Sequence, residues 1–157
     1  MIHPSAIIDP SAVIGENVTV GPWTTIGPDV KIGDGCSISS HVVIKGPSTL
    51  GKNNRIYQFS TVGEDTPDLK YKGEPTQLVI GDNNTIREGV TIHRGTIQDK
   101  NETLIGNNNL FMAYAHVGHD SVVGSNVIMG NNSAIAGHVE LGDWVIVSGY
   151  SLIHQFV

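Results

Sequence analysis

Aliphatic residues recur at every sixth position along most of the chain. Counting by six from Ile2, the positions up to Val62 are all aliphatic, and the same spacing resumes from Ile80 to Ile92 and from Ile105 to Ile153. All 23 positions reached in this way are apolar, although only 39% of the chain is hydrophobic. A small or β-branched residue often stands two positions before them, and a glycine often follows. The pattern is therefore a six-residue repeat with one apolar position in each unit.

A period of six fits neither the 3.6-residue period of an α-helix nor the strict alternation of a long strand. It suits a short strand followed by a tight turn, with one bulky side chain per repeat pointing inward. Three such repeats would close a triangular coil of 18 residues, and stacked coils would bury a continuous aliphatic column. Polar pairs such as Asp82-Asn83 and Asn107-Asn108 suit the turns, because Asn and Asp tolerate unusual φ. We predict an all-β fold, a parallel β-helix with three faces per coil. The periodicity indicates no handedness, and the general rule for parallel crossovers favours the right hand.

Two segments interrupt the repeat, at about residues 63–79 and 96–103. Both are polar, and the first contains two prolines, so we expect two inserted loops that leave the β-helix. Loops on a rigid scaffold commonly carry function. A solvated excursion without a role is the alternative for the first segment.

The length of the second interruption brings most of the histidines onto one edge. Ile92 and Ile105 are 13 residues apart, seven more than the repeat requires. If these seven residues loop out, the column occupied by Ile92 continues in the following coils through Val117, Ile135 and Ile153. Five of the seven histidines then lie beside this column, together with several neighbours: His93, Arg94, His116, His119, Asp120, Gly137, His138, His154 and Gln155.

This edge offers groups suited to general-base chemistry. A neutral imidazole, with an ordinary pKa near 6.5, can act as a general base, and Asp120 follows His119 directly, so its carboxylate could orient that ring. Gly137 offers a backbone N–H suited to an oxyanion. No serine nucleophile motif is present and Cys36 is expected to point into the wall, so direct transfer to a bound hydroxyl is favoured over covalent catalysis. Clustered histidines also bind zinc, and that alternative stays open.

Composition and charge exclude several other classes of function. The net charge is −6, whereas nucleic-acid binding requires a basic surface, so no nucleic acid is expected as a partner. With 157 residues and no shift in composition, the chain is expected to form a single β-helix domain at residues 1–157. The one cysteine, Cys36, excludes an internal disulfide and fits a reducing compartment. Because the chain shows no secretory signal pattern and no apolar run of about 18 residues, we predict a cytoplasmic protein with no integral membrane segment.

Five short motifs lie in the first interruption and along the histidine edge. They are Asp-Leu-Lys-Tyr-Lys-Gly-Glu-Pro-Thr at 68–76, Thr-Ile-His-Arg-Gly-Thr at 91–96, His-Val-Gly-His-Asp at 116–120, Ala-Gly-His at 136–138 and Ile-His-Gln-Phe at 153–156. They resemble motifs of the UDP-N-acetylglucosamine acyltransferases, a family of hexapeptide-repeat enzymes. The resemblance implies a left-handed β-helix, a homotrimer with active sites between neighbouring subunits, and neither cofactor nor metal. It also implies transfer of an (R)-3-hydroxyacyl group from acyl carrier protein to the glucosamine 3-hydroxyl of UDP-N-acetylglucosamine, the first step of lipid A biosynthesis.

The same resemblance implies roles for individual residues. His119 corresponds to the general base, Asp120 to its supporting acid and Gly137 to the oxyanion N–H. Family members continue beyond the position of Val157 with further coils and a C-terminal helical domain, so we expect this chain to be a fragment. Six more residues correspond to those that hold the sugar, the phosphate region and the acyl donor: Asp68, Lys70, His116, His138, His154 and Gln155.

Three alternatives remain open. A zinc-dependent lyase of the γ-carbonic-anhydrase type also uses three histidines across a trimer interface, but His116 and His119 are closer in sequence than we expect for that site. A non-catalytic β-helix module is opposed by the two interruptions and the aligned histidines. The third alternative is the N-acyltransferase that acts later in the same pathway, and against it the segments 68–76 and 153–156 favour the O-acyltransferase.

Overall fold

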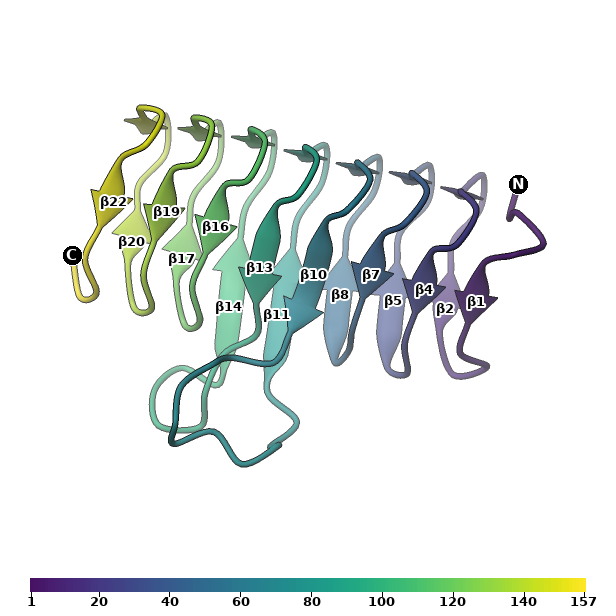
Figure 1. Cartoon of the computed structure of the whole chain (residues 1–157), viewed down its shortest axis with the longest axis horizontal. Helices are drawn as coiled ribbons and strands as arrows, with labels where there is room; N and C mark the ends of the chain where they lie inside the picture. Colours follow the sequence, from purple (N-terminus) through teal and green to yellow (C-terminus); the bar gives the residue numbers. More distant parts are fainter.

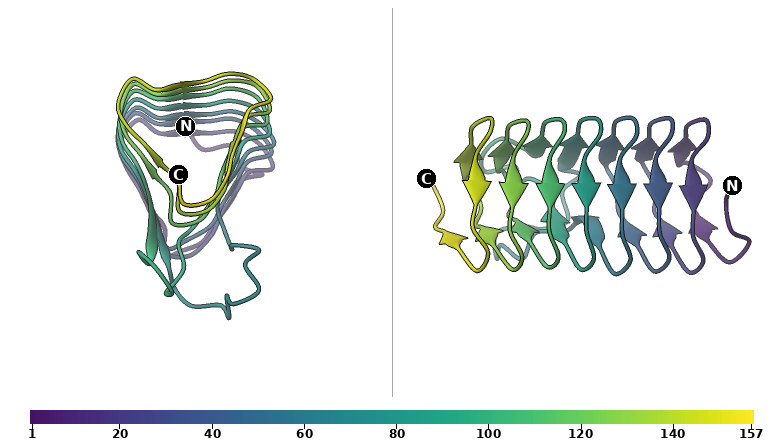
Figure 2. Two further views of the ribbon diagram at one scale, coloured as in Figure 1. Left: turned by 90° about the vertical axis from the view of Figure 1, so that its left-hand side faces the viewer. Right: turned by 90° about the horizontal axis from the view of Figure 1, so that it is seen from above.

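The chain winds into a parallel β-helix with three sheets. The computed structural model describes all 157 residues and contains 22 short strands. Successive strands belong to successive sheets, so three strands complete one coil (Figure 1). Seen along its axis the coil is triangular, and the coils stack in register along the length of the molecule (Figure 2). The two termini lie at opposite ends of the stack (Figure 1).

The strands divide among the sheets according to their place in the coil. The first sheet contains, in spatial order, β1 (Ile7–Ile8), β4 (Thr25–Ile26), β7 (Val43–Ile44), β10 (Thr61–Glu64), β13 (Thr91–His93), β16 (His116–Val117), β19 (Ala134–Ile135) and β22 (Leu152–Ile153). The second contains β2 (Val13–Ile14), β5 (Val30–Ile32), β8 (Ser48–Leu50), β11 (Gln77–Ile80), β14 (Glu102–Ile105), β17 (Val122–Val123) and β20 (Glu140–Leu141). The third contains β3 (Thr19–Val20), β6 (Ser37–Ile38), β9 (Arg55–Ile56), β12 (Thr85–Ile86), β15 (Leu110–Phe111), β18 (Ile128–Met129) and β21 (Ile146–Val147).

The six-residue repeat places its apolar position in the core. Of the 23 apolar repeat positions, all but Ile2, Ile8, Ile14 and Ile153 are buried. These four lie in the outermost coils, where only one neighbouring coil covers them. Full burial of an aliphatic side chain is worth about 1.5–3 kcal/mol, so the stacked column is the main stabilising element. Cys36 is also buried in this core, as predicted.

Strand pairing confirms the predicted length of the second interruption. Ile92 pairs with Val117, which in turn pairs with Ile135, so seven residues leave the coil between β13 and β14. We call residues 65–76, between β10 and β11, the first loop and residues 94–101, between β13 and β14, the second loop.

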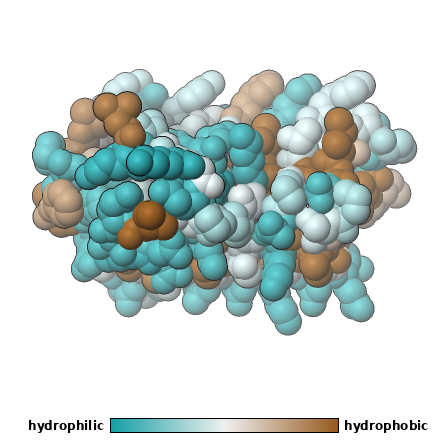
Figure 3. Space-filling model, turned by 90° about the horizontal axis from the view of Figure 1, so that it is seen from below, coloured by the Kyte–Doolittle hydropathy of each residue, from teal (hydrophilic) through white to brown (hydrophobic).

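Both loops leave the same corner of the triangle, where first-sheet strands turn into second-sheet strands, and they lie side by side below the coils (Figures 1 and 2). We call this edge the loop corner. The face of the molecule that carries the loops is mainly hydrophilic, with a few separate hydrophobic groups (Figure 3). No helix in the structure has the length and hydropathy of a membrane-spanning segment.

The corners of the coil require a left-handed backbone conformation whatever side chain they carry. Asn83 has a φ of 59°, as expected for a turn asparagine, but Trp23 (63°), Tyr114 (61°) and His138 (64°) adopt the same conformation. Such a φ costs a residue with a Cβ about 1–2 kcal/mol, and the stacking of neighbouring coils holds it in place. At the loop corner, Asp120 (58°) and His138 occupy this position in adjacent coils.

Candidate active site

Successive coils place polar side chains at the loop corner. His119 and Asp120 follow β16, Gly137 and His138 follow β19, and His154 follows β22. Because the strands of these coils pair in register, the residues that follow them lie above one another. The two loops leave the same corner in the preceding coils, so their side chains can reach the same region.

A buried carboxylate holds the imidazole of His119. Asp120 Oδ2 lies 2.8 Å from His119 Nδ1 and accepts a hydrogen bond from Thr96 Oγ1 at 2.6 Å, while Oδ1 accepts one from the Thr96 backbone N–H at 2.9 Å. Burial alone would raise the pKa of the Asp120 carboxyl, but the hydrogen bonds from His119 and Thr96 outweigh it and lower this pKa below its ordinary value. The charged carboxylate therefore keeps the imidazole proton on Nδ1 and leaves His119 Nε2 as an acceptor.

The first loop brings a second carboxylate to the other side of this ring. Asp68 Oδ2 lies 4.0 Å from His119 Nε2, and the two side chains are only 19% and 15% exposed. Asp68 Oδ1 accepts a hydrogen bond from the backbone N–H of Lys70 at 2.8 Å, which fixes the turn of the loop. The free nitrogen of His119 thus faces a small space bounded by Asp68.

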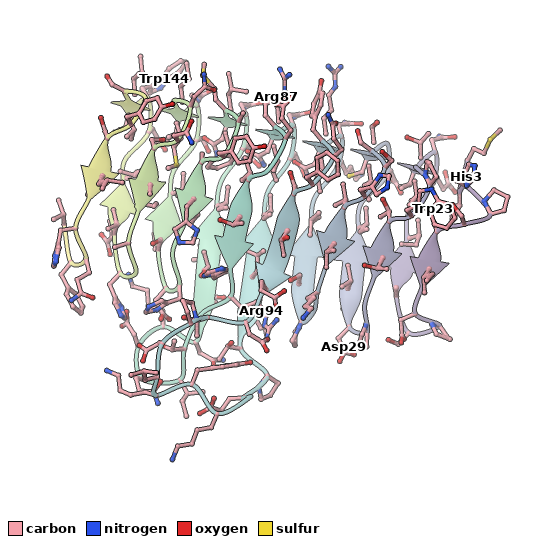
Figure 4. All side chains as sticks on the ribbon, viewed as in Figure 1. His3, Trp23, Asp29, Arg87, Arg94 and Trp144 are labelled. Atoms are coloured by element: carbon pink, nitrogen blue, oxygen red, sulfur yellow. The ribbon has the colours of Figure 1, made fainter.

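Arg94 anchors the loop that carries Asp68. Its guanidinium is 4% exposed and donates to the carbonyl of Gly63, the carboxylate of Asp65 and the hydroxyl of Tyr71. Gly63 precedes the loop and the other two partners belong to it, so one buried cation ties the loop to the end of β13 (Figure 4). Hydrogen bonds to a charged group contribute more than neutral ones, about 1.5–3 kcal/mol each.

Gly137 lies against the ring of His119, one coil further along. A Cβ at this position would lie 2.6 Å from both Cε1 and Nε2 of the ring, too close for any side chain. The Gly137 N–H has no acceptor within the chain. The missing side chain therefore gives His119 its space, and Nε2 lies against a residue whose backbone N–H is free to donate.

A second imidazole–carboxylate pair lies beside the first. His138 Nδ1 is 2.6 Å from Asp99 Oδ2 in the second loop. The His138 ring meets the His119 ring edge-on, with centroids 4.9 Å apart and planes at 87°. Its other face stacks on Phe156 at 4.5 Å and 10°. The orientation of His138 is thus fixed from three sides.

The histidines His93 and His116 form a separate pair on the first sheet. Their ring centroids are 4.8 Å apart, and His116 Nδ1 lies 2.7 Å from Thr91 Oγ1. Burial, with the neighbouring His116, lowers the pKa of His93 to about 4. Burial and the nearby His119 also lower the pKa of His116. These two rings therefore act as neutral hydrogen-bonding groups near pH 7.

An open apolar cavity of about 470 Å³ adjoins His116. His154 stands on its far side and is exposed, with Nδ1 3.4 Å from the Gln155 carbonyl. The cavity thus runs from the histidines toward the last coil. Its lining is His116, Ala134, Ile135, Ala136, Leu152, Ile153 and His154.

The predicted site residues fall into three groups in space. Around the ring of His119 the structure collects Asp68, Asp120, Gly137 and His138. A second group, His116 and His154, lines the apolar cavity. The third group, Lys70 and Gln155, is exposed, and its side chains have no hydrogen-bond partner in the chain.

Four supporting residues were not among the predicted site residues. Arg94 and Thr96 belong to the 91–96 motif, which could have pointed to them. Thr103, whose Oγ1 accepts the Asp120 backbone N–H at 3.0 Å, occupies an ordinary repeat position. Nothing in the sequence indicates that Asp99 meets His138, because this contact depends on the path of the second loop.

The same geometry bears on the zinc alternative. His119, Asp120 and His138 each offer one atom within 4.8 Å of one another. The Asp120 carboxylate, however, already accepts hydrogen bonds from Thr96 and from His119. The group is two imidazole–carboxylate pairs, not an open set of ligands, and we assign no metal to it.

Comparison with known proteins defines the class. The model of the bacterial transferase hexapeptide, with six repeats, matches residues 11–46, 29–64 and 102–137. These segments make up more than half of the chain. The chain therefore belongs to the bacterial hexapeptide transferase family.

Particular relatives are similar to it at high identity. Over 112 residues the chain is 71% identical to the acyl-[acyl-carrier-protein]–UDP-N-acetylglucosamine O-acyltransferase of Stutzerimonas stutzeri, an alignment that covers 71% of this chain and 43% of that protein. Among solved structures, LpxA from Acinetobacter baumannii is 55% identical with a TM-score of 0.98, covering 99% of this chain and 60% of that one. The UDP-N-acetylglucosamine acyltransferase of Francisella novicida is 44% identical with a TM-score of 0.98, covering 99% and 57%.

These comparisons confirm two predictions from the sequence. The resemblance to UDP-N-acetylglucosamine acyltransferases is confirmed, and so is the left-handed parallel β-helix built from hexapeptide repeats. The chain spans less than two thirds of the length of these relatives.

Proposed function

We propose that this chain carries the active-site corner of an acyltransferase that moves an (R)-3-hydroxyacyl group from acyl carrier protein to the 3-hydroxyl of UDP-N-acetylglucosamine. This reaction is the first step of lipid A biosynthesis. One observation carries the proposal: His119 is held through Nδ1 by the buried Asp120, while its Nε2 lies against Gly137, a residue with no side chain and an unpaired N–H. The high identity to O-acyltransferases supports the substrate classes.

The proposed reaction is direct transfer with His119 as general base. Nε2 takes the proton of the acceptor 3-hydroxyl as that oxygen attacks the thioester carbonyl, and Asp120 stabilises the resulting imidazolium. The Gly137 N–H donates to the oxyanion of the tetrahedral intermediate. When the intermediate collapses, the carbon–sulfur bond breaks and the proton passes from Nε2 to the departing thiol of the carrier protein.

The remaining residues are proposed to bind the substrates. Asp68 faces the same nitrogen as the acceptor hydroxyl and is placed to orient the sugar. His116 and His154, at the two sides of the apolar cavity, would contact the acyl donor, and the cavity offers room for an apolar chain. His138, Lys70 and Gln155 complete the proposed contacts to the sugar and the phosphate region.

We further propose a homotrimer, a cytoplasmic location, and a reaction that uses neither cofactor nor metal. Exposed apolar side chains support an assembly, because a neighbouring subunit would remove them from water. Sedimentation analysis of the purified protein tests the trimer. Ile7 (69%) and Leu152 (78%) both belong to the first sheet, and the open apolar cavity beside His116 lies on the last coils of that sheet.

The activity is tested by an acyl-transfer assay with UDP-N-acetylglucosamine and (R)-3-hydroxyacyl carrier protein. It is run on this chain and on the longest reading frame that encodes it, with zinc content measured in both. Transfer without bound zinc supports the proposal. No transfer by either protein, together with stoichiometric zinc, contradicts it and favours the lyase.

A matched pair of variants tests the general base. His119→Asn should lower transfer by about 10²- to 10⁴-fold. His41→Asn is the control, because His41 lies at a different corner, with φ of 55°, and has no proposed role. A His119→Asn variant within a few-fold of the unmodified protein would refute the assignment.

A further inference from the structure

We propose that Asp99, in the second loop, is a positioning residue that fixes the tautomer and orientation of His138 for substrate. This inference rests on the proposed function, in which His138 contacts the substrate. The proposed catalytic and substrate-binding residues lie on the coils and in the first loop, and Asp99 would support one of them from the second loop.

The contact itself is short and well enclosed. Asp99 Oδ2 lies 2.6 Å from His138 Nδ1, and the two side chains are 35% and 14% exposed. A charge-assisted hydrogen bond between nitrogen and a carboxylate is usually about 2.7–2.9 Å long, so this contact is slightly shorter than that range. Since a carboxylate only accepts, Nδ1 must carry the proton, and Nε2 is the nitrogen left to face a ligand.

Packing fixes the plane of the His138 ring but not which of its two edges faces Asp99. Phe156 stacks on one face of His138 and the His119 ring meets it edge-on. Rotation of the imidazole by 180° about its Cβ–Cγ bond would exchange Nδ1 for a carbon and lose the bond to Asp99. The carboxylate therefore selects one of two ring orientations that packing alone would allow.

The second loop is tied to both imidazole–carboxylate pairs. Thr96, two residues into the loop, donates twice to Asp120, and Lys100 Nζ lies 3.4 Å from the Asp120 carbonyl and 3.2 Å from the Glu140 carboxylate. The backbone N–H of Asn101 donates to the Thr96 carbonyl at 2.9 Å. These contacts hold Asp99 at a fixed place between its neighbours.

The arrangement repeats the first pair with a different source of carboxylate. His119 receives its carboxylate from the next residue in the chain, whereas His138 receives its carboxylate from a residue 39 positions earlier. Replacing Asp99 should therefore affect His138 and leave the His119–Asp120 pair intact.

The test combines kinetics with a direct reading of the tautomer. Asp99→Ala and Asp99→Glu are compared with Asp29→Ala. Asp29 is a corner aspartate three coils earlier, and its side chain has no hydrogen-bond partner in the chain (Figure 4). Transfer is measured for each, alone and combined with His138→Ala. Nitrogen-15 NMR of labelled histidine reports whether the His138 proton is on Nδ1 or Nε2.

We expect Asp99→Ala to lower kcat/KM by about 10- to 100-fold, the size of effect that misplacing a substrate-contacting group produces. Because alanine offers no acceptor to Nδ1, we expect the same variant to move the His138 proton to Nε2. We expect Asp99→Glu to restore Nδ1 protonation, and the kinetic effect to vanish when His138 is alanine. A rate within twofold of the unmodified protein, or an equal loss in the His138→Ala background, would overturn the proposal. If the unmodified protein shows no transfer, the proposed function fails, and the tautomer alone then decides the role of Asp99.

Discussion

Replacing Asp120 by asparagine would put an NH₂ donor where the carboxylate oxygen now accepts a hydrogen bond from His119 Nδ1. The carboxylate accepts three hydrogen bonds: two from Thr96 and one from His119. An asparagine can keep its oxygen on the Thr96 N–H, and the Thr96 hydroxyl can turn to accept from the new NH₂. The bond to His119 cannot be kept in the same sense, because two N–H groups would face each other.

The imidazole must therefore change tautomer, placing its proton on Nε2 and its lone pair on Nδ1. The nitrogen that faces Asp68 and Gly137 then has no lone pair with which to accept a proton. Positioned general bases contribute about 10²–10⁴ in rate, so we expect kcat to fall by that factor. Loss of one hydrogen bond to a charged group should lower the free energy of unfolding by about 1.5–3 kcal/mol. Part of this is offset because asparagine suits the φ of 58° at position 120.

Three measurements check this expectation: kcat for acyl transfer, the His119 tautomer by nitrogen-15 NMR, and the melting temperature, which should fall by about 2–4 °C per kcal/mol in a protein of this size. Asp82→Asn is the matched control, since Asp82 Oδ1 accepts only the Lys52 backbone N–H at 2.7 Å at another corner. Unchanged kcat together with protonated Nε2 would refute the reasoning, because it would show that the lone pair on Nε2 is not needed.

Other perturbations have outcomes that the structure also specifies. The pKa of His93 is about 4 in the native state and near 6.5 when unfolded, so the unfolded chain binds the extra proton between these values. The free energy of unfolding should therefore fall by about 2–3 kcal/mol as the pH drops from 7 to 4. When this free energy is measured by denaturant titration at each pH, its fall should be smaller in His93→Gln, and an equally steep fall in the variant would contradict the assignment. Val117→Asp places an unpaired charge at a position with no exposure and should abolish cooperative unfolding measured by circular dichroism. A variant that still unfolds cooperatively would contradict the inward orientation of this side chain. Arg94→Met should loosen the first loop and lower transfer, and limited proteolysis should cut residues 65–76 faster than in the unmodified protein; equal cleavage rates would show that Arg94 does not hold the loop.

The repeat made most of the fold predictable from the sequence. Each six-residue unit is specified locally by one apolar position and a turn, so the coils and their core follow without knowledge of distant contacts. The seven-residue excess between Ile92 and Ile105 sufficed to predict which strands pair across the second loop. The aromatic residues at the corners, such as Trp23 and Tyr114, could not be anticipated from turn preferences, because the stacked coils impose a positive φ that their side chains do not favour.

From spacing alone, the site was predictable only where it lies on the coils, and Asp68 in the first loop was indicated by the family resemblance instead. His119, Asp120 and Gly137 hold fixed places in the repeat, so their proximity follows from the 18-residue coil. The histidines, however, divide between the sheet face, with His93 and His116, and the corner, a distinction that counting along a column does not make. Contacts made by the loops, such as those of Asp99, depend on a path with no periodicity and could not be derived from spacing.

Parallel strands are separated by about 4.8 Å, so equivalent positions on successive coils are spaced by about that distance along the edge of the molecule. The ring centroids of aromatic residues on adjacent coils have nearly this spacing: 4.8 Å for His93 and His116, 4.9 Å for His119 and His138, and 4.5 Å for His138 and Phe156. The axial place of a functional group is therefore set by the coil to which it belongs. A ligand lying along the edge therefore contacts side chains at regular intervals, one coil after another. A substitution in one coil can change the contacts at that position while the side chains of the other coils stay in place.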